Sequence, residues 1–362
     1  MLIDDSESSL HRRVLLQGLV GTAAASLLSM NSLADVKPRM SQLGLVLYCA
    51  RFRRDALRSR DQQFDLYSPH NFLEYCRNVG AGGMQCALGT LDAAAVRRLR
   101  EYAEKNALYI EAIVKLPKDE ADVVRFDREM KSAADAGARA ARTTIIPGRR
   151  YEYFKSIEMF HEFDVRGRQM LERGTPVAEK YRLPIAVENH KDHLDDQRIK
   201  LFEHISSEFV GACVDTGNSF ALLEDPIETV EKFAPWAHSV HLKDQALQAY
   251  HDGFLLGDIP LGQGGLDLIR MVEILKKARP SIRFTLELIT RDPLEVPCLA
   301  DSYWTTFPGR RATALASALR YVRDHSTRNL QYVSRMSPEE QLVREEMNVR
   351  QSLDYARDEL GI

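Results

Sequence analysis

The stretch that decides the fold reads Gly211-Ala-Cys-Val-Asp215-Thr-Gly-Asn218 and, after a connection of helical length, His238-Ser-Val-His241-Leu-Lys243-Asp244. Each of its two segments is a short apolar run that ends in side chains able to bind a metal. An α/β enzyme presents its chemistry in this way, at the carboxyl ends of parallel strands. The stretch therefore predicts two such strands with a functional site at their ends.

The two segments belong to a series of eight short runs that are apolar or β-branched and are bounded by Gly, Pro and Asn. The runs cover residues 43–49, 84–88, 108–114, 138–146, 183–188, 210–215, 239–242 and 282–288. Runs of this length without alternating polar residues are typical of parallel strands buried on both faces. Amphipathic segments separate them, most clearly at residues 92–106 and 119–136, and each of these two opens with an Asp that can cap a helix.

Eight strands that alternate with helices predict an α/β protein with a (β/α)8 TIM barrel. The alternative is a doubly wound open sheet, but no glycine-rich phosphate loop follows the first strand. We expect the barrel to occupy residues 35–290, with a hairpin or lid at residues 250–265. Residues 291–362 are expected to form a C-terminal helical extension, with a last helix from Ser337 onward. The extension suits packing across the barrel base and a subunit interface of a homo-oligomer equally well.

The N-terminus has the pattern of a twin-arginine-type export signal. His11-Arg12-Arg13-Val14-Leu15-Leu16 leads into a Gly/Ala-rich run at residues 18–28, and Ser32-Leu33-Ala34 offers a cleavage site of small residues. Residues 1–34 are therefore expected to be a signal peptide, and the protein to be periplasmic or otherwise exported. Acidic residues near the start keep an ordinary amphipathic helix open as the alternative. No other stretch approaches the roughly 18 apolar residues that span a bilayer, so no membrane contact is expected once the signal is removed.

The composition excludes some partners. The 362 residues include 49 basic and 52 acidic ones, and the formal net charge is -3. The chain therefore offers no bulk attraction to nucleic acid or to an anionic membrane. The five cysteines form no CxxC pair and are expected to be buried thiols rather than disulfides.

Four polar side chains stand at consecutive strand ends: Glu188, Asp215, His241 and Glu287. In a closed barrel the carboxyl ends of neighbouring strands converge on one point. Three carboxylates and one imidazole form an oxygen-rich site for a divalent ion, with Mn2+ as the leading candidate and Mg2+, Co2+ or Zn2+ as alternatives. The other interpretation is that each acid is an isolated helix cap or ion-pair partner.

Five motifs follow one another along the chain: Glu188-Asn189-His190, Asp215-Thr216-Gly217-Asn218, His241-Leu242-Lys243-Asp244, Pro260-Leu-Gly-Gln-Gly-Gly-Leu-Asp267 and Glu287. Together they resemble the xylose-isomerase-like barrel superfamily of sugar isomerases and epimerases, and the match covers about residues 41–290. The resemblance implies that the four strand-end residues are metal ligands. It further implies that Glu188 and Glu287 combine ligation with proton transfer, while Asp215 and His241 chiefly hold the metal. Asn218 stands where several family members carry a histidine, so the substrates of known epimerases do not transfer directly.

Six residues are candidates for contacts with a carbohydrate substrate: His190, His193, Asn218, Lys243, Phe254 and Trp304. The two histidines and Lys243 could bind sugar hydroxyls or act as an alternative base. The two aromatics are expected in loops, where the apolar face of a sugar stacks on such rings. Structural alternatives remain open: Lys243 as a buried ion-pair partner, His193 as a solvated loop residue, and the aromatics as a cover between the barrel and the extension.

Together these residues predict a divalent-metal-dependent sugar isomerase or epimerase. It would abstract the proton next to a carbonyl through a metal-bound enediolate. A neutral, non-phosphorylated sugar or sugar derivative is expected as substrate, since export argues against phosphorylated ones. The main alternative is a 3-oxo-glycoside lyase, which would expel the aglycone by β-elimination with the same metal and base. A non-catalytic carbohydrate-binding barrel and a repair endonuclease of the same superfamily are further alternatives, although the endonuclease would require more histidine ligands and a basic surface.

Overall fold

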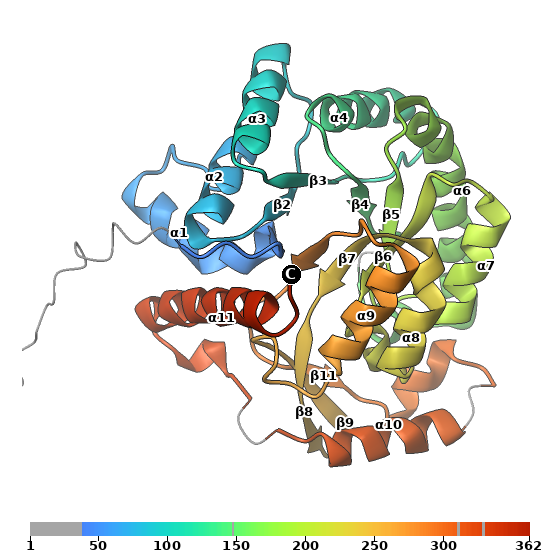
Figure 1. Ribbon diagram of the computed structural model, residues 1–362. Helices are drawn as coiled ribbons and strands as arrows, with labels where there is room; N and C mark the ends of the chain where they lie inside the picture. Colours follow the sequence, from blue (N-terminus) through green and yellow to red (C-terminus); the bar gives the residue numbers. More distant parts are fainter. Residues whose placement is uncertain (1–37, 147, 310–311, 328–329) are drawn as a thin grey trace, which may run out of the picture. The chain divides into compact units, whose positions relative to one another are not determined.

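A closed barrel of eight parallel strands forms the centre of the protein (Figure 1). The computed structural model describes residues 38–146, 148–309, 312–327 and 330–362, so the expected export signal at residues 1–34 lies outside the described part. The barrel strands are β1 (Gly44–Val46), β2 (Gly83–Cys86), β3 (Tyr109–Ile113), β4 (Ala141–Thr143), β5 (Ile185–Glu188), β6 (Val210–Asp215), β7 (Ala237–Leu242) and β10 (Phe284–Leu286). Each of the eight expected strands is present.

The first and last barrel strands close the sheet on itself. β1 pairs in parallel with β2 on one side and with β10 on the other, where Leu45 lies opposite Leu286. The strands from β2 to β7 pair in chain order, and β10 pairs with β7. This closure confirms the TIM barrel and excludes the doubly wound open sheet, which has two free edges.

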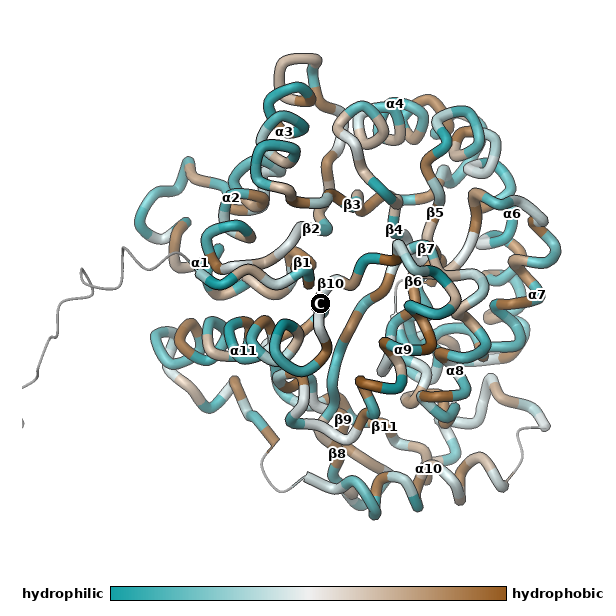
Figure 2. Tube along the Cα trace, in the orientation of Figure 1, coloured by the Kyte–Doolittle hydropathy of each residue, from teal (hydrophilic) through white to brown (hydrophobic). Residues whose placement is uncertain are grey.

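Helices cover the outside of the barrel because each has one apolar face. The helices of the barrel region are α1 (Arg51–Arg60), α2 (Pro69–Val79), α3 (Ala93–Lys105), α4 (Val123–Asp135), α5 (Arg150–Tyr153), α6 (Ile157–Tyr181), α7 (Asp195–Ile205), α8 (Pro226–Phe233) and α9 (Leu268–Ala278). Hydrophobic and hydrophilic residues alternate along them in Figure 2. Among the described residues, no helix is both long and apolar enough to cross a membrane. The five cysteines are buried free thiols, as expected.

A small antiparallel sheet lies outside the barrel; two of its strands are inserted between β7 and α9, and the third follows β10. It contains β8 (Asp244–Tyr250), β9 (Gly253–Ile259) and β11 (Leu294–Val296), and α10 (Ala312–Asp324) packs against it (Figure 1). The expected hairpin is therefore present, but it begins earlier, because β8 follows directly on Lys243 and pairs residue for residue with β9. A hydrophobic core separate from that of the barrel joins this sheet to α10.

The C-terminal extension is helical, as expected, and its last helix lies along the barrel wall rather than across the base. In α11 (Pro338–Asp358), Asn348 donates to Thr290 Oγ1 beyond the carboxyl end of β10 (3.0 Å). At the other end, the Ile362 carbonyl accepts a hydrogen bond from Ser41, which precedes β1 (2.7 Å). Apolar residues of α11 belong to the barrel core. The extension therefore helps to cover the barrel.

Glu345 of α11 ties the extension to the first helix. Its carboxylate accepts hydrogen bonds from the backbone N–H groups of Phe52 (2.9 Å) and Arg53 (2.8 Å), in the first turn of α1. Amides in a first helical turn have no partner within their own helix. Glu345 therefore caps α1 from a distant part of the chain.

Replacing Glu345 by Gln is expected to lower the free energy of unfolding by about 1–2 kcal/mol, because a neutral amide caps two backbone amides less well than a carboxylate. Equilibrium unfolding in urea measures the change. Glu346→Gln is the matched control: Glu346 is partly exposed and pairs with Arg53 at the surface, so its replacement should cost no more than about 0.5 kcal/mol. Equal losses in the two variants would contradict the capping role.

Candidate metal centre

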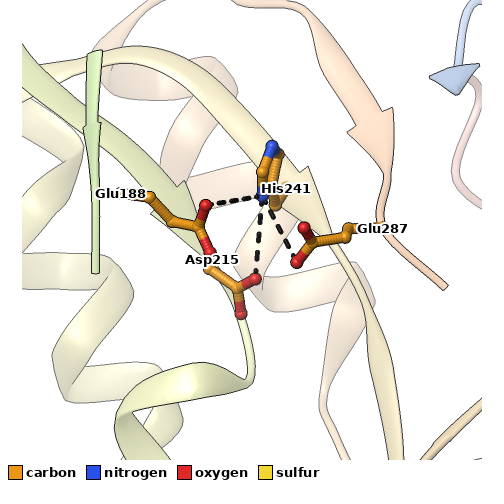
Figure 3. A group of neighbouring side chains, drawn as sticks. All are labelled: Glu188, Asp215, His241 and Glu287. Carbon is orange, nitrogen blue, oxygen red and sulfur yellow. Dashed lines mark ion pairs between the residues drawn. The ribbon is translucent and has the colours of Figure 1, made fainter. Parts of the chain in front are cut away.

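The four expected strand-end residues meet at the carboxyl end of the barrel. Glu188 ends β5, Asp215 ends β6, His241 lies on β7 and Glu287 follows β10. Ligand atoms from the four residues lie within 4.8 Å of one another. His241 Nδ1 is 3.5 Å from Glu188 Oε2, 3.5 Å from Glu287 Oε2 and 3.8 Å from Asp215 Oδ2 (Figure 3). All four side chains are buried.

Hydrogen bonds between side chains and backbone fix the strand ends that carry these residues. Asn189, just after Glu188, accepts from the Asp215 backbone N–H (2.7 Å) and donates to the Asp215 carbonyl (2.9 Å), which ties β5 to β6. Thr216 Oγ1 donates to the Lys243 carbonyl (2.9 Å) and accepts from the Lys243 N–H (3.0 Å), which ties β6 to β7. The polar residues beside the candidate ligands therefore hold them in register.

A chain of buried polar groups fixes the ring of His241. Its Nε2 lies 2.8 Å from Oε1 of Gln85 on β2. The amide nitrogen of Gln85 donates to Glu111 on β3 (2.9 Å), and Ser239 donates to the same carboxylate (2.7 Å). Because an amide oxygen can only accept, Nε2 of His241 carries a proton. Its Nδ1 is then the atom directed at the three carboxylates, as a metal ligand requires.

Two cations lie among the three carboxylates. Lys243 Nζ is 3.0 Å from Glu287 Oε2 and 3.1 Å from Asp215 Oδ2, and Arg142 on β4 forms an ion pair with Glu188. Burial raises the pKa of Glu188 and of Glu287, but Arg142 and Lys243 outweigh it and hold both pKa values below the ordinary one. For Asp215 burial is the larger effect, and it raises the pKa to about 6.

Within the described residues, two buried atoms of the group make no hydrogen bond, namely His241 Nδ1 and Asp215 Oδ2, the latter in an ion pair with Lys243. Buried polar atoms of native proteins are normally paired, so these two are available for a ligand that both face. Carboxylate oxygens and an imidazole nitrogen suit a divalent metal ion and leave coordination positions for substrate oxygens. The four residues therefore fit a metal site.

A cavity of about 450 Å3 adjoins the group, and Glu287 forms part of its wall. Three of the expected substrate contacts also line it: His190, Asn218 and Lys243. Its volume is in the range of small-molecule binding sites. The cavity is therefore the candidate substrate site.

The other three expected substrate contacts lie elsewhere. His193 is buried against α6, where its Nε2 is 2.7 Å from Asp164 Oδ1, so it is neither solvated nor in the cavity. Phe254 is completely buried in the core of the small sheet. Trp304 donates its ring N–H to the Cys298 carbonyl (3.0 Å) and packs against that same core. Phe254 and Trp304 therefore pack in or against the core of the small sheet, which agrees with the structural alternative and not with a substrate contact.

Asn218 connects the four-residue group to a second lysine. Its Nδ2 donates to Glu188 Oε1 (2.9 Å). Its Oδ1 accepts from Lys243 Nζ (3.2 Å) and from Lys191 Nζ. One amide thus sets the positions of a candidate ligand and of two ammonium groups.

The glycine-rich motif at residues 260–267 folds around Asp244. The Asp244 carboxylate accepts hydrogen bonds from the backbone N–H groups of Gly262 (2.9 Å) and Gly264 (2.8 Å). A Cβ at Gly264 would lie 2.1 Å from Asp244 Oδ1, so no larger residue fits there. Asp244 therefore anchors this loop. The carboxylates that pair with Lys243 are those of Asp215 and Glu287, in the candidate metal centre.

Three residues of the site escape prediction from the sequence: Arg142, Gln85 and Lys191. Arg142 and Gln85 are buried polar residues in otherwise apolar strands. Because a buried polar side chain requires a partner, their positions within apolar runs are the sequence signal that could have identified them. Lys191 lies in a loop of polar residues, and nothing in the local sequence distinguishes it.

Comparison with known proteins gives one family and several relatives. The family model described as xylose isomerase-like TIM barrel matches residues 73–325. The 3-oxo-isoapionate decarboxylase of Pectobacterium atrosepticum is 27% identical over 134 residues, which are 36% of this chain and 49% of the relative. The match thus spans about half of that relative's length.

Two solved structures have a similar fold. D-psicose 3-epimerase with D-tagatose from Clostridium cellulolyticum H10 has a TM-score of 0.53 and 11% identity, over 82% of this chain and 97% of the other. A D-psicose 3-epimerase solved in the presence of D-fructose has a TM-score of 0.53 and 12% identity, over 83% and 95%. At these identities the likeness shows the fold alone.

Metal binding is expected to release protons and to strengthen as the pH rises. Burial lowers the pKa of His241, but its neighbours Cys213, Glu287 and Glu188 outweigh burial and raise that pKa well above the ordinary value. The pKa of Asp215 is raised to about 6. Both groups must be deprotonated to bind a metal, so the affinity for Mn2+ should increase as the pH rises from about 6. Calorimetric titration in buffers of different ionisation enthalpy counts the released protons, and a pH-independent affinity would contradict this expectation.

Replacing Gln85 by Leu is expected to weaken Mn2+ binding about 10- to 100-fold, because the ring of His241 loses the acceptor that fixes its tautomer. Competition with a fluorescent chelator measures the affinity. Gln42→Leu is the control, because Gln42 is exposed and precedes β1 at the opposite end of the barrel. If both variants bind Mn2+ like the parent protein, Gln85 does not orient the ligand.

Proposed function

Because the chain belongs to the xylose isomerase-like TIM barrel family, we propose that it is a divalent-metal-dependent isomerase or epimerase of a non-phosphorylated sugar or sugar derivative. The observation that carries the proposal is the convergence of Glu188, Asp215, His241 and Glu287 beside a cavity at the carboxyl end of the barrel. TIM-barrel enzymes have their active sites at this end. The names of the structurally similar D-psicose 3-epimerases agree with sugar chemistry.

Glu287 is our candidate for the general base. The four residues would together hold the metal, with Mn2+ as the leading candidate; a divalent ion supplies a Lewis acid that stabilises the negative charge of an enediolate. Glu287 forms part of the cavity wall, and despite burial Lys243 keeps its pKa well below the ordinary value. It is therefore ionised at neutral pH and can accept the proton from the carbon next to a carbonyl.

Glu188 is our candidate for the second proton transfer. Glu188 and Glu287 lie on opposite sides of His241 Nδ1 in Figure 3, each at 3.5 Å. Arg142 Nε (2.7 Å) and Asn218 Nδ2 (2.9 Å) each bind one oxygen of Glu188. Return of a proton to the other face of the same carbon gives an epimer, and return to the neighbouring carbon gives an isomer.

His190 is suited to bind a sugar hydroxyl. It lines the cavity, and its buried Nδ1 makes no hydrogen bond with any residue that the structure describes. Burial keeps the pKa of His190 below the ordinary value, so the ring is neutral at neutral pH. A neutral imidazole offers one donor and one acceptor, which is the pattern that a hydroxyl complements.

The partial match to a 3-oxo-isoapionate decarboxylase agrees with the same chemistry. Loss of carbon dioxide from a 3-oxo acid leaves an enolate, as does loss of a proton next to a carbonyl. Both reactions benefit from a Lewis acid beside the carbonyl oxygen. The proposal therefore rests on enolate chemistry, which the site residues support, and not on a particular sugar.

Glu287→Gln is expected to slow proton abstraction at least about 100-fold, because an amide cannot accept the proton. The assay follows deuterium uptake from D2O into D-fructose, D-psicose and D-tagatose by NMR, with saturating Mn2+ and measured metal content. Glu295→Gln, which changes an exposed carboxylate on β11, is the matched control and should keep full activity. Undiminished exchange in metal-loaded Glu287→Gln would refute the assigned role.

The alternatives give different outcomes in companion assays. Release of an aglycone from a 3-oxo-glycoside, without deuterium exchange into ketoses, would replace the isomerase by the lyase. A protein that neither binds nor gains stability from Mn2+, Co2+ or Zn2+ would favour the carbohydrate-binding barrel.

A further inference from the structure

Basic side chains outnumber acidic ones in the wall of the cavity beside the candidate metal centre. Five basic side chains line it: Arg142, Arg149, Lys191, Lys243 and Arg291. The acidic residues in the same wall are two, Glu152 and Glu287. A concave site with such an excess of positive charge favours an anionic ligand.

Four of the five cations are neutralised by carboxylates of the protein. Arg149 pairs with Glu152 (2.7 Å), and Arg291 pairs with the buried Asp258 (3.0 Å). The two cations at the metal centre pair with its carboxylates. These four charges therefore do not by themselves call for a further anion.

Lys191 is the exception. The residue is 4% exposed, and within the described part of the chain no carboxylate forms an ion pair with its Nζ. Its hydrogen-bond acceptor is Asn218 Oδ1, an uncharged oxygen that Lys243 Nζ also contacts at 3.2 Å. Burial and the positive charges of Lys243 and Arg291 lower the pKa of Lys191 to about 8, which leaves it charged at neutral pH. A buried ammonium that shares its acceptor with a second ammonium is unfavourable unless an anion joins it.

The backbone holds Lys191 in a conformation that few side chains adopt. Its φ is +63°, in the left-handed region that non-glycine residues rarely occupy. The Lys191 carbonyl accepts a hydrogen bond from the Arg150 N–H (2.9 Å), which fixes the loop in this conformation. The loop therefore holds the Lys191 backbone in one defined conformation.

A divalent ion at the candidate metal centre would add to the positive charge of the cavity. The three carboxylates of the centre already pair with Arg142 and Lys243, and Lys191 pairs with none of them. A divalent ion held by the centre therefore leaves the cavity with a surplus of positive charge. A substrate that carries a negative charge of its own would reduce this surplus.

We propose, on the basis of the proposed function, that the substrate is a sugar acid and that Lys191 binds its carboxylate, with Arg291 in the same cavity wall. This differs from the neutral sugar expected from the sequence. One unpaired ammonium matches the single charge of a carboxylate better than the double charge of a phosphate monoester. The carboxylate site lies beside Glu287, so it would also orient the substrate for proton abstraction.

Calorimetric titration with four probes tests the carboxylate site: D-gluconate, D-glucuronate, D-fructose and D-glucose 6-phosphate. We expect the two acids to bind at least about tenfold more tightly than D-fructose. Lys191→Met should weaken acid binding about 30-fold or more, in the metal-free and in the Mn2+-loaded protein. Lys191→Arg keeps the charge and should retain most of the affinity, and Lys191→Gln replaces the Met variant if that variant does not fold. Lys115→Met, at an exposed lysine, is the control that should change nothing.

Unchanged acid binding in Lys191→Met would overturn the proposal, as would tighter binding of D-fructose or of the sugar phosphate. Deuterium exchange separates this failure from failure of the proposed function. Exchange into neutral ketoses without acid binding overturns the carboxylate site alone. Acid binding that depends on Lys191, with no exchange into any oxo sugar or oxo sugar acid, supports the site and overturns the proposed function.

Discussion

Three buried carboxylates that face one imidazole nitrogen are the constraint on which the rest of the site depends. Glu188, Asp215 and Glu287 lie 3.5 to 3.8 Å from His241 Nδ1, where burial alone would favour their protonated forms. Arg142 and Lys243 supply the positive charge that keeps two of them ionised. The protein therefore maintains a charged donor set by itself, and the two cations must share these carboxylates with any metal ion that binds.

The closed barrel makes this concentration of charge possible. β5, β6, β7 and β10 are consecutive neighbours in the sheet, so the side chains at their carboxyl ends have to converge. The β8–β9 hairpin separates β7 from β10 along the chain without disturbing their pairing, because it leaves the barrel directly after Lys243. Gln85 on β2 contacts His241 across the interior of the barrel, and Glu111 on β3 accepts a hydrogen bond from Gln85. Closure thus gives the site both its ligands and the groups that orient them.

The barrel and its four strand-end residues can be predicted from the sequence because each depends on a local pattern. A short apolar run that ends in a carboxylate or a histidine predicts a buried strand with a polar side chain at its carboxyl end. The surroundings of Phe254 and Trp304 cannot be read in this way, since an aromatic residue beside a loop looks the same whether it lines a cavity or packs in a second core. Lys191 is harder to predict still: its importance comes from Asn218, from Lys243 and from the lack of a paired carboxylate among the described residues, and the sequence near position 191 shows none of these.

Asn218 explains how an ammonium pair and a metal centre coexist. Its amide accepts from Lys191 and Lys243 with one oxygen and donates to Glu188 with its nitrogen. An imidazole offers one donor and one acceptor when neutral, so a histidine, which the resembling family often has at this position, could not receive two ammonium groups while donating to Glu188. Lys191 therefore depends on Asn218 for its hydrogen-bond acceptor. Asn218 thus accommodates a second ammonium group beside the candidate metal centre, where the anionic substrate that we propose would bind.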